Sequence, residues 1–466
     1  MTHTTPSTPA DLGAAAGSVA DVIAAAGNPV TALRGAPFPA MSFLQWEQTN
    51  WQHEQYLWRE TAAFLDQSHH MVDLFVEGPD ALRLFSELGV NSFANFGPGK
   101  AKQFVAAAPD GHLIGDAILF HLENGTFDLV GLPTCLAWVL YNIETGDYDV
   151  THTWDDNSWV RRGSPRLYRY EVQGPAADDI VRCAIDGELP ALRFFQMGSV
   201  SIAGRRVGTL KHGMAGAAGF EFWGPWADAE AVRDALTEAG EPFGMGRVGY
   251  RAYTTLTLES AWISLPVPAV YDLPALQGYR EWLPAGHLGS LAGSFESDSI
   301  SDYYVTPYDI GYGKVVRFDH DFVGRDALER IAERPGLRKV TFAWNGDDVA
   351  DIYRSQFTDD GRLPARFVDV PKSRAARFTY DTVTGPDGAP AGFSLDTGFL
   401  GPDRRVLSIG MVDEAHAGTG TQVTITWGEP EGSTRPHLPA HRQTTVRATV
   451  LPAPYSDYAR TQYRAV

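Results

Sequence analysis

The stretch FLDQSHHMVDLFVEGPDALRLFSEL, residues 64–88, decides the fold that we expect for this chain. Its apolar run Met71 to Val76 predicts a strand, because β-branched and aromatic residues fit a buried pleated surface. The tripeptide Gly78-Pro79-Asp80 predicts a turn, and Ala81 to Leu88 predicts a short helix with Asp80 at its N-cap or in its first turn. The stretch therefore predicts one strand, turn and helix unit.

Four polar side chains stand at the entrance of this strand: Asp66, Ser68, His69 and His70. Neighbouring side chains on a strand point to opposite faces, so the two adjacent histidines cannot serve the same surface. We expect one histidine to support the fold and the other to face a cavity. The alternative is that both are ordinary histidines of the core or the surface, with their hydrogen bonds satisfied.

A second unit of the same order follows at Tyr168 to Cys183, where Gln173-Gly174-Pro175 forms the expected turn. Before the first unit, helix-like spacing of aromatic residues predicts a helix over Trp46 to Leu65. Between the units, Pro109-Asp110-Gly111 predicts the turn of a hairpin. Helices and strands of this kind predict an α+β fold.

The second half of the chain changes character. Gly244 to Gly249 matches the Gly-x-Gly-x-x-Gly string of dinucleotide-binding turns, but the strand-like run Tyr250 to Leu258 follows it where a helix is required. We therefore interpret this string as a loop. Asp321 to Arg330 predicts a helix, and from Arg338 onward strands and turns predict a C-terminal antiparallel β-rich domain.

Composition limits the possible partners. The chain has 466 residues and a net charge of −19, which argues against nucleic acid and anionic membranes as partners because both recruit clustered Lys and Arg. Its cysteines, Cys135 and Cys183, offer neither a disulfide framework nor a zinc motif, and we expect no metal. With no apolar run long enough to span a bilayer and no signal peptide, we expect a cytoplasmic protein. Its first thirty or so residues are expected to be partly disordered, with a short amphipathic turn at Val19 to Ala25.

Several segments carry a resemblance in their order along the chain: Phe64 to Val72, Gly99 to Asp116, Gln173 to Pro175, Gly213 to Pro225 and Pro307 to Leu328. Together they resemble the folate-dependent aminomethyltransferase family, the glycine-cleavage T-proteins, over most of the chain. This resemblance implies an α+β fold of three domains in a cloverleaf, with folate in the central hole. We expect the domains to comprise residues 35–76 with 165–255, residues 77–164 with 256–335, and residues 336–466.

Other segments are similar to the tetrahydrofolate-dependent aryl O-demethylases that act on vanillate and related lignin aromatics: Asp66 to Leu74, Lys211 to Gly216, Arg251 to Tyr253, Tyr271 to Pro284 and Trp344 to Asp348. Departures from the T-proteins agree with this likeness. Met214 stands where T-proteins have a tyrosine, and Tyr253 replaces an arginine. The resemblance therefore implies a phenolic ether as substrate rather than an amine on a lipoyl carrier.

The same resemblance implies the cofactor site. Glu221 matches the family glutamate that binds the amide-like edge of the pterin, and a carboxylate suits two adjacent N–H donors. Gln103 and Asp116 complete the implied pocket, and Met214 lies beside the pterin. The expected cofactor is tetrahydrofolate.

Cleavage of an aryl ether leaves charge on the aryl oxygen. A donor with a pKa near 10 matches a phenolate leaving group, so Tyr253 is the first catalytic candidate and His70 the second. The alternative for Tyr253 is a core tyrosine bonded to a backbone carbonyl. Gln67 and His69 are expected to line the substrate pocket, and His69 is also expected to support the fold or orient its neighbours.

Two further positions bear on the substrate. Leu132 stands where vanillate-type demethylases have an arginine that is taken to pair with the substrate carboxylate, and Phe38 stands where a tyrosine is expected. An unpaired buried carboxylate costs about 3 to 5 kcal/mol. We therefore expect a neutral aromatic ether, either a methoxyarene or a methylenedioxyphenyl lignan of the sesamin type, which would give methyl- or methylene-tetrahydrofolate.

Other interpretations remain open from the sequence. One is a vanillate- or syringate-type O-demethylase that acts on an aromatic acid. Another is a folate-binding assembly protein without a one-carbon substrate, which would need neither Tyr253 nor His70. A third, an amine demethylase or oxidase subunit, is weakened because no convincing flavin fingerprint is present. The oligomeric state does not follow from the sequence.

Overall fold

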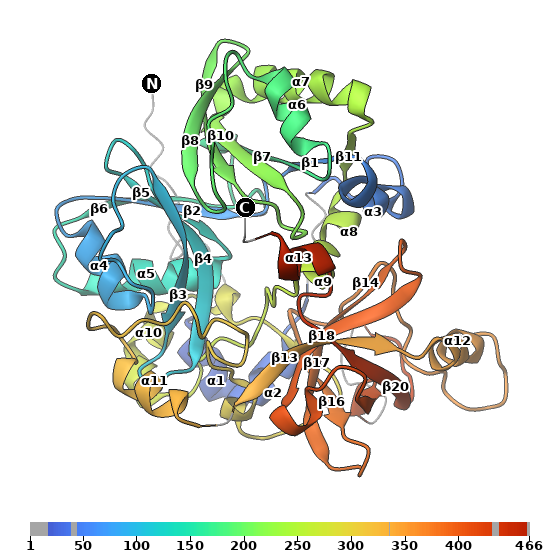
Figure 1. Cartoon of the computed structure of the whole chain (residues 1–466). Helices are drawn as coiled ribbons and strands as arrows, with labels where there is room; N and C mark the ends of the chain where they lie inside the picture. The colour runs from blue at the N-terminus through green and yellow to red at the C-terminus, as the bar shows by residue number, and fades with distance from the viewer. Residues whose placement is uncertain (1–16, 39–43, 335, 431–437, 464–466) are drawn as a thin grey trace.

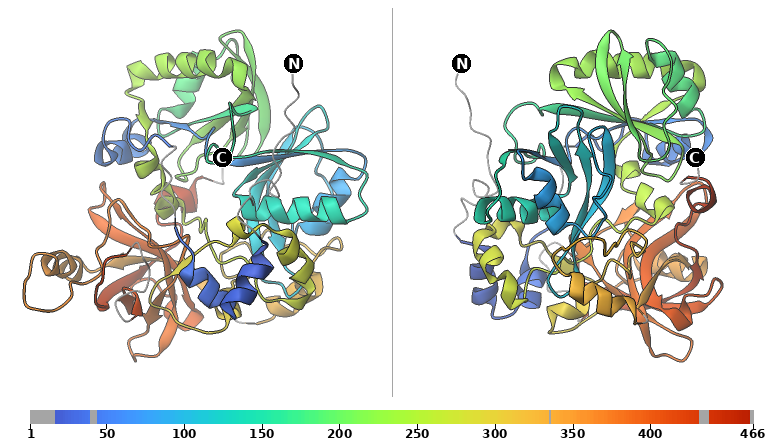
Figure 2. Two further views of the ribbon diagram at one scale, coloured as in Figure 1. Left: turned by 180° about the vertical axis from the view of Figure 1, so that it is seen from behind. Right: turned by 60° about the vertical axis from the view of Figure 1, so that its left-hand side comes forward.

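The computed structural model describes residues 17–38, 44–334, 336–430 and 438–463. Figure 1 shows three lobes around a common centre, with the C-terminal helix α13 (Asp457–Thr461) near that centre. Two lobes contain an antiparallel-rich sheet covered by helices, and the third is a β-barrel. Figure 2 shows the same three lobes from two other directions.

The first lobe is built on a six-stranded sheet in the order β11-β1-β7-β10-β9-β8. Its strands are β1 (Ala63–Asp66), β7 (Leu167–Gln173), β8 (Met197–Ile202), β9 (Arg205–Lys211), β10 (Gly219–Pro225) and β11 (Gly246–Val248). Helices α6 (Ala177–Ala184) and α7 (Ala229–Gly240) pack on each other and on this sheet, and α3 (Trp51–Glu60) packs near β1 and β11. The expected helix over Trp46 to Leu65 is therefore correct only in its middle, because its C-terminal part continues as strand β1.

The second lobe is built on a five-stranded sheet in the order β3-β4-β5-β2-β6. Its strands are β2 (Val72–Glu77), β3 (Lys100–Ala107), β4 (Leu113–His121), β5 (Phe127–Gly131) and β6 (Thr151–Asp155). Strand β2 pairs with β5 and β6, so the domain boundary expected after residue 76 is wrong. The chain leaves the first sheet at Asp66 and enters the second at Val72.

Helices surround the second sheet and fill the base of the molecule. They are α1 (Val19–Ala26), α2 (Pro29–Gly35), α4 (Ala81–Leu88), α5 (Pro133–Thr145), α10 (Gln277–Trp282) and α11 (Arg325–Ala332). The short amphipathic turn expected at Val19 to Ala25 is confirmed as α1, which has a capping box at Ser18 and packs against α10. Residues 1–16 lie outside the described part of the chain.

Four local predictions have mixed outcomes. The hairpin around Pro109-Asp110-Gly111 is confirmed as β3 and β4, and the second strand, turn and helix unit is confirmed as β7 and α6. The expected strand over Tyr250 to Leu258 is wrong, because the segment forms the short helices α8 (Tyr250–Tyr253) and α9 (Leu256–Ser260). Asp80 is the N-cap residue of α4, as expected, but its side chain makes no capping hydrogen bond and its carboxylate pairs with Arg83.

The third lobe confirms the expected antiparallel β structure near the C-terminus. Its strands follow the order β14-β17-β16-β19-β20-β13-β18, and a further pairing of β17 with β18 closes the barrel. The strands are β13 (Leu337–Trp344), β14 (Lys372–Ser373), β16 (Asp381–Thr384), β17 (Pro390–Leu400), β18 (Arg405–Asp413), β19 (Gln422–Trp427) and β20 (Thr444–Leu451). Helix α12 (Gly346–Ser355) lies between β13 and β14 in the sequence. Strand β15 (Phe378–Thr379) pairs with β12 (Leu291–Ala292) of the base.

A buried ion cluster joins the first two sheets. Arg169 on β7 donates to the carboxylates of Asp73 on β2 and Asp128 on β5, the latter at 2.6 Å. Burial, with the neighbouring charge of Asp73, raises the pKa of Asp128 to about 8. The two sheets are therefore held face to face by one guanidinium shared between two carboxyl groups.

Among the described helices, none is long and apolar enough to cross a membrane.

Candidate active site

The two adjacent histidines lie in a turn, and this corrects the expectation that they begin a strand. The turn carries the chain from β1 to β2, where it changes sheets. His69 accepts or donates at 2.8 Å to Ser158 Oγ, and its carbonyl accepts from Ser158 N–H. His69 therefore fastens the turn to the segment after β6.

His70 faces a different group of residues. Its Nε2 lies 2.8 Å from the hydroxyl of Tyr253, whose oxygen is also 2.9 Å from Met214 Sδ. A phenol has one proton, so a hydroxyl that donates to the thioether accepts from the Nε2–H of His70. Burial, with the nearby His69, lowers the pKa of His70 to about 4, so the imidazole is neutral at neutral pH.

A buried glutamate underlies this group. Glu171 on β7 is fully buried, accepts from the backbone N–H of Met214 at 2.7 Å and accepts from the amide of Gln67. Burial raises the pKa of Glu171 well above its usual range, and the charge of Glu221 adds to the effect. Burial, and to a smaller extent the charge of Glu171, also raises the pKa of Tyr253 well above 10, so its hydroxyl keeps its proton.

Glu221 on β10 lies directly opposite Glu171 on the neighbouring strand. Directly paired residues project from the same face of a sheet, so the two carboxyl groups are neighbours. His212 Nδ1 lies 2.6 Å from Glu221 Oε1, and within the described chain Oε2 makes no hydrogen bond. The site thus presents one carboxylate oxygen that is available to a ligand.

Gln103 and Asp116 form a second polar group on the other sheet. Gln103 Nε2 donates to Asp116 Oδ2 at 2.8 Å, and Tyr312 and Trp262 also donate to that oxygen, at 3.0 and 3.1 Å. Burial raises the pKa of Asp116, while these donors oppose the rise. No hydrogen bond between described residues connects this group with Glu221, so the structure gives the expected cofactor residues as two separate groups.

The expected substrate residues lie apart in the sequence and have different environments. Leu132 is the half-buried N-cap residue of α5, after β5, and it makes no side-chain cap. Phe38 is half-buried just after α2. Gln67 is buried beneath Met214 and bonded to Glu171.

Sequence reasoning missed Glu171 and His212. Two charged residues, Arg169 and Glu171, within the strand-like run Tyr168 to Val172 were the available signal, because a charged group in a central strand is costly unless it is paired or protonated. His212 carried no comparable signal. Its role depends on the pairing of β9 with β10, which brings it beside Glu221.

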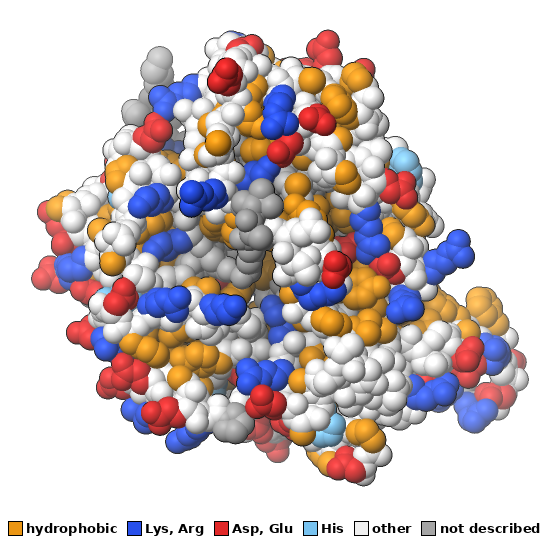
Figure 3. Space-filling view, viewed as in Figure 1, with side chains coloured by type: hydrophobic (Ala, Val, Ile, Leu, Met, Phe, Trp, Pro, Cys, Tyr) orange, Lys and Arg blue, Asp and Glu red, His pale blue; other side chains and the backbone are white. Residues whose placement is uncertain are grey.

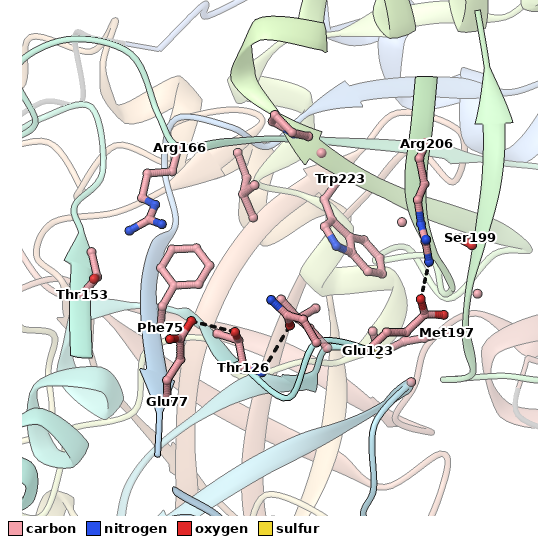
Figure 4. Close-up of a pocket in the computed structure, with 18 of the residues that line it drawn as sticks. Phe75, Glu77, Glu123, Thr126, Thr153, Arg166, Met197, Ser199, Arg206 and Trp223 are labelled. Carbon is pink, nitrogen blue, oxygen red and sulfur yellow. Dashed lines mark hydrogen bonds and ion pairs between the residues drawn. The ribbon is translucent and has the colours of Figure 1, made fainter. Parts of the chain in front are cut away.

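A separate cavity of about 820 Å³ opens between the first two sheets (Figure 4). In that view Arg166 and Phe75 stand on one side and Trp223 on the other, with an Arg206–Glu123 ion pair at one end. None of the site residues expected from the sequence lines this cavity. The two arginines in its wall are balanced by Glu77 and Glu123, so its charge selects no ligand class.

Figure 3 shows a hollow where the lobes meet, with Lys and Arg side chains near its edge. Several basic groups of the lobes are occupied internally: Lys102 donates to the carbonyl of Ser92, Lys211 to Asp178, and Arg161 to Asp155. Within the described ranges, no three His, Cys, Asp or Glu side chains come together in a way that could hold a metal ion.

The sequence of the chain is similar to those of known proteins. Residues 27–266 match the family described as the GCVT N-terminal domain. The chain is 42% identical to syringate O-demethylase of Sphingobium sp., over 96% of this chain and 97% of that protein. It is 31% identical to sesamin methylene transferase of Sinomonas sp., over 82% and 83% of the two chains.

A solved structure supports the fold. The chain resembles the glycine cleavage system aminomethyltransferase T from Bartonella henselae with a TM-score of 0.61 and 17% identity, over 98% of this chain and 99% of that one. This likeness confirms the expected α+β fold of the aminomethyltransferase type with a C-terminal antiparallel β domain. The family resemblance inferred from the sequence is likewise confirmed.

Proposed function

We propose that this chain, which belongs to the GCVT aminomethyltransferase family and is a tetrahydrofolate-dependent one-carbon transferase, cleaves a neutral aromatic ether. The observation that carries the proposal is the Tyr253 hydroxyl, which lies within hydrogen-bond distance of both His70 and Met214 above two buried glutamates. A proton donor held in this way suits an aryl oxygen that gains negative charge as its bond to carbon breaks.

The described residues fit the cofactor. Glu221 offers the free carboxylate oxygen Oε2, which suits the adjacent N–H groups of a pterin edge. The buried amide Nε2 of Gln173, two residues beyond Glu171 on β7, has no hydrogen-bond partner among the described residues, so a ligand acceptor would satisfy it. Gln103 and Asp116 would hold the cofactor from the second lobe. Bound tetrahydrofolate supplies the nucleophilic nitrogen that accepts the one-carbon unit.

Tyr253 and His70 then have distinct tasks. The thioether of Met214 is a weak acceptor, so the Tyr253 proton can turn from sulfur to the aryl oxygen at little cost. His70 continues to donate its Nε2–H to the Tyr253 oxygen, which orients the hydroxyl and stabilises the charge that it gains. Because the pKa of Tyr253 is raised by burial, it stabilises the leaving phenolate by hydrogen bonding rather than by full proton transfer.

The neutral character of the substrate is argued from Leu132 and Phe38. Neither side chain can pair with a carboxylate, and a carboxylate that loses its partner on binding costs about 3 to 5 kcal/mol when fully buried. A methoxyarene would yield methyl-tetrahydrofolate and a phenol, whereas a methylenedioxyphenyl lignan would yield the methylene form and a catechol. The similarity to sesamin methylene transferase supports the second possibility.

A second candidate is an O-demethylase that acts on an aromatic acid, in the cytoplasm as expected from the sequence. The similarity to syringate O-demethylase favours it, at higher identity and coverage than the sesamin enzyme. The N-terminus of α5 beside Leu132 also has no side-chain cap, and exposed N–H groups at a helix N-terminus favour a carboxylate. The two candidates therefore differ in one measurable property, the ratio of activity on acids and on neutral ethers.

The test is a panel of vanillate, syringate, methoxyarenes and sesamin, incubated with protein and tetrahydrofolate, with mass detection of the folate product. Tyr253→Phe should lower kcat at least about a hundredfold, as expected for loss of an oxyanion donor, while the Kd for tetrahydrofolate stays within about threefold. Tyr279→Phe is the matched control, because that buried hydroxyl on α10 has no recorded hydrogen bond in the described chain. Unchanged turnover in Tyr253→Phe would exclude its role, and folate binding without turnover of any ether would favour the assembly-protein alternative.

A further inference from the structure

An arm projects from the side of the C-terminal barrel. It comprises α12, which packs on β18 and β20, and the loop that follows, residues 346–367 in all, and the loop stands away from the barrel in Figures 1 and 2. Three large apolar side chains of this loop are exposed: Phe357 by 89%, Leu363 by 49% and Phe367 by 51%. Single exposed apolar residues are ordinary, but three on one short projection indicate a contact surface.

A groove lies beside the base of the arm. It has a volume of about 810 Å³ and is lined by aromatic side chains that include Trp51, Tyr353 and Phe399. Arg404 and Arg405 stand at its edge, both exposed, and neither makes a hydrogen bond or an ion pair from its guanidinium with any described residue. The groove thus combines an aromatic floor with two available positive charges.

The charges of the arm complement those of the groove. The arginines of the arm are already paired, Arg354 with Asp351 and Arg362 with Asp360. Asp359 is exposed, lies two residues from Phe357 and has no ion pair within the described chain. The tip of the arm therefore offers an aromatic side chain next to an unpaired carboxylate, which is the chemistry that the groove accepts.

We propose that two copies of this chain associate through these surfaces, with the arm of each copy against the groove of the other. Arm and groove adjoin each other, because Tyr353 of α12 lines the groove together with barrel residues and Trp51 of the first lobe, so a twofold axis would form both contacts at once. Phe357 would cover the aromatic floor, and Asp359 would pair with Arg404 or Arg405. The chain carries a net charge of −19, so two copies repel each other except where a basic surface meets an acidic one.

The experiment is sedimentation velocity with light scattering on the full chain over a wide range of concentration. We expect the wild type to form a dimer. Phe357→Asp and the double variant Arg404→Glu with Arg405→Glu should each raise the dimer dissociation constant by about a hundredfold, because each change acts at both contacts of a twofold dimer. Leu82→Asp is the matched control, since Leu82 is exposed by 38% on α4, and it should leave the dimer intact.

Mixing gives a second test that a folding defect would not mimic. Phe357→Asp has an altered arm and an unchanged groove, whereas the arginine double variant has an altered groove and an unchanged arm. In a heterodimer of the two, the unchanged arm meets the unchanged groove, so one of the two contacts is restored. We expect heterodimers in the mixture at concentrations where each variant alone is monomeric. A monomeric wild type at every concentration, or a dimer that neither variant weakens, would overturn the proposal.

Discussion

Replacement of Leu132 by arginine tests the choice of substrate directly. Leu132 ends the connection from β5 and caps α5 without a side-chain hydrogen bond, so no existing contact of its side chain with a polar group is lost. Its side chain is half-buried, and a longer side chain at this position keeps its charged end near solvent. The substitution therefore adds a guanidinium to the expected substrate side and removes little else.

The magnitude follows from this partial burial. A charge-assisted hydrogen bond contributes about 1.5 to 3 kcal/mol, whereas the 3 to 5 kcal/mol of a fully buried pair does not apply at a half-exposed position. We therefore expect the ratio of kcat/KM for aromatic acids to that for neutral ethers to rise roughly tenfold to a hundredfold. A cation at a helix N-terminus opposes the macrodipole at a cost of about 0.3 to 1 kcal/mol, so the Tm should fall only by a few degrees.

The assay measures kcat/KM for syringate, vanillate and the neutral ethers with the wild type, Leu132→Arg and Leu132→Met. The methionine variant is the control for changed shape without charge, and its ratio should match that of the wild type. If the ratio of kcat/KM for acids to that for neutral ethers in Leu132→Arg stays within about threefold of the wild-type ratio, position 132 does not contact the carboxylate end of the substrate. If the wild type already turns over an aromatic acid faster than every neutral ether, the argument from Leu132 is refuted and the second candidate stands.

Three further predictions concern stability, measured by urea denaturation. The pKa of His70 is lowered to about 4, so its neutral imidazole contributes fully to the free energy of unfolding above pH 6.5, and this contribution is lost as the pH falls toward 4. His70→Asn should therefore make the free energy of unfolding less dependent on pH between about 6.5 and 4. Arg169→Met should destabilise the protein by about 3 to 5 kcal/mol, because Asp73 and Asp128 lose their shared counter-charge, and a loss below about 1 kcal/mol would contradict this. Glu171→Ala should cost about 2 to 4 kcal/mol by leaving two donors unpaired, whereas Glu171→Gln should cost about half as much, because its amide oxygen replaces one acceptor and its NH₂ group cannot replace the other.

Local sequence patterns predicted the elements that local chemistry determines. The turn at Pro109-Asp110-Gly111 and the strand, turn and helix unit at Tyr168 to Cys183 are both present, because turn residues and apolar periodicity act within a few residues. The same patterns failed at Tyr250 to Leu258, where tertiary contacts decide. The helix α8 packs on α3, and this contact overrides the strand-like composition of the segment.

The histidine turn failed for a different reason. A continuous apolar run after His70 implied a strand that began at the histidines, but the chain changes sheets between Asp66 and Val72, and a change of sheet requires a turn. In a turn the alternation of faces no longer applies, yet the two histidines still separate into different tasks. The separation comes from their partners, Ser158 for His69 and Tyr253 for His70, and these lie far away in the sequence.

The pKa shifts of Tyr253 and His70 change the chemistry that the sequence suggested. A tyrosine with its ordinary pKa would match a phenolate and could exchange a proton with it, but burial and Glu171 raise the pKa of Tyr253 well above that of the leaving group. His70, with its lowered pKa, cannot supply a second proton at neutral pH. The pair is therefore neutral before the reaction, and its contribution is a fixed hydrogen-bond donor to the aryl oxygen. Neither Tyr253 nor His70 supplies a positive charge that could pair with a substrate carboxylate, which is an argument for a neutral ether that does not depend on Leu132.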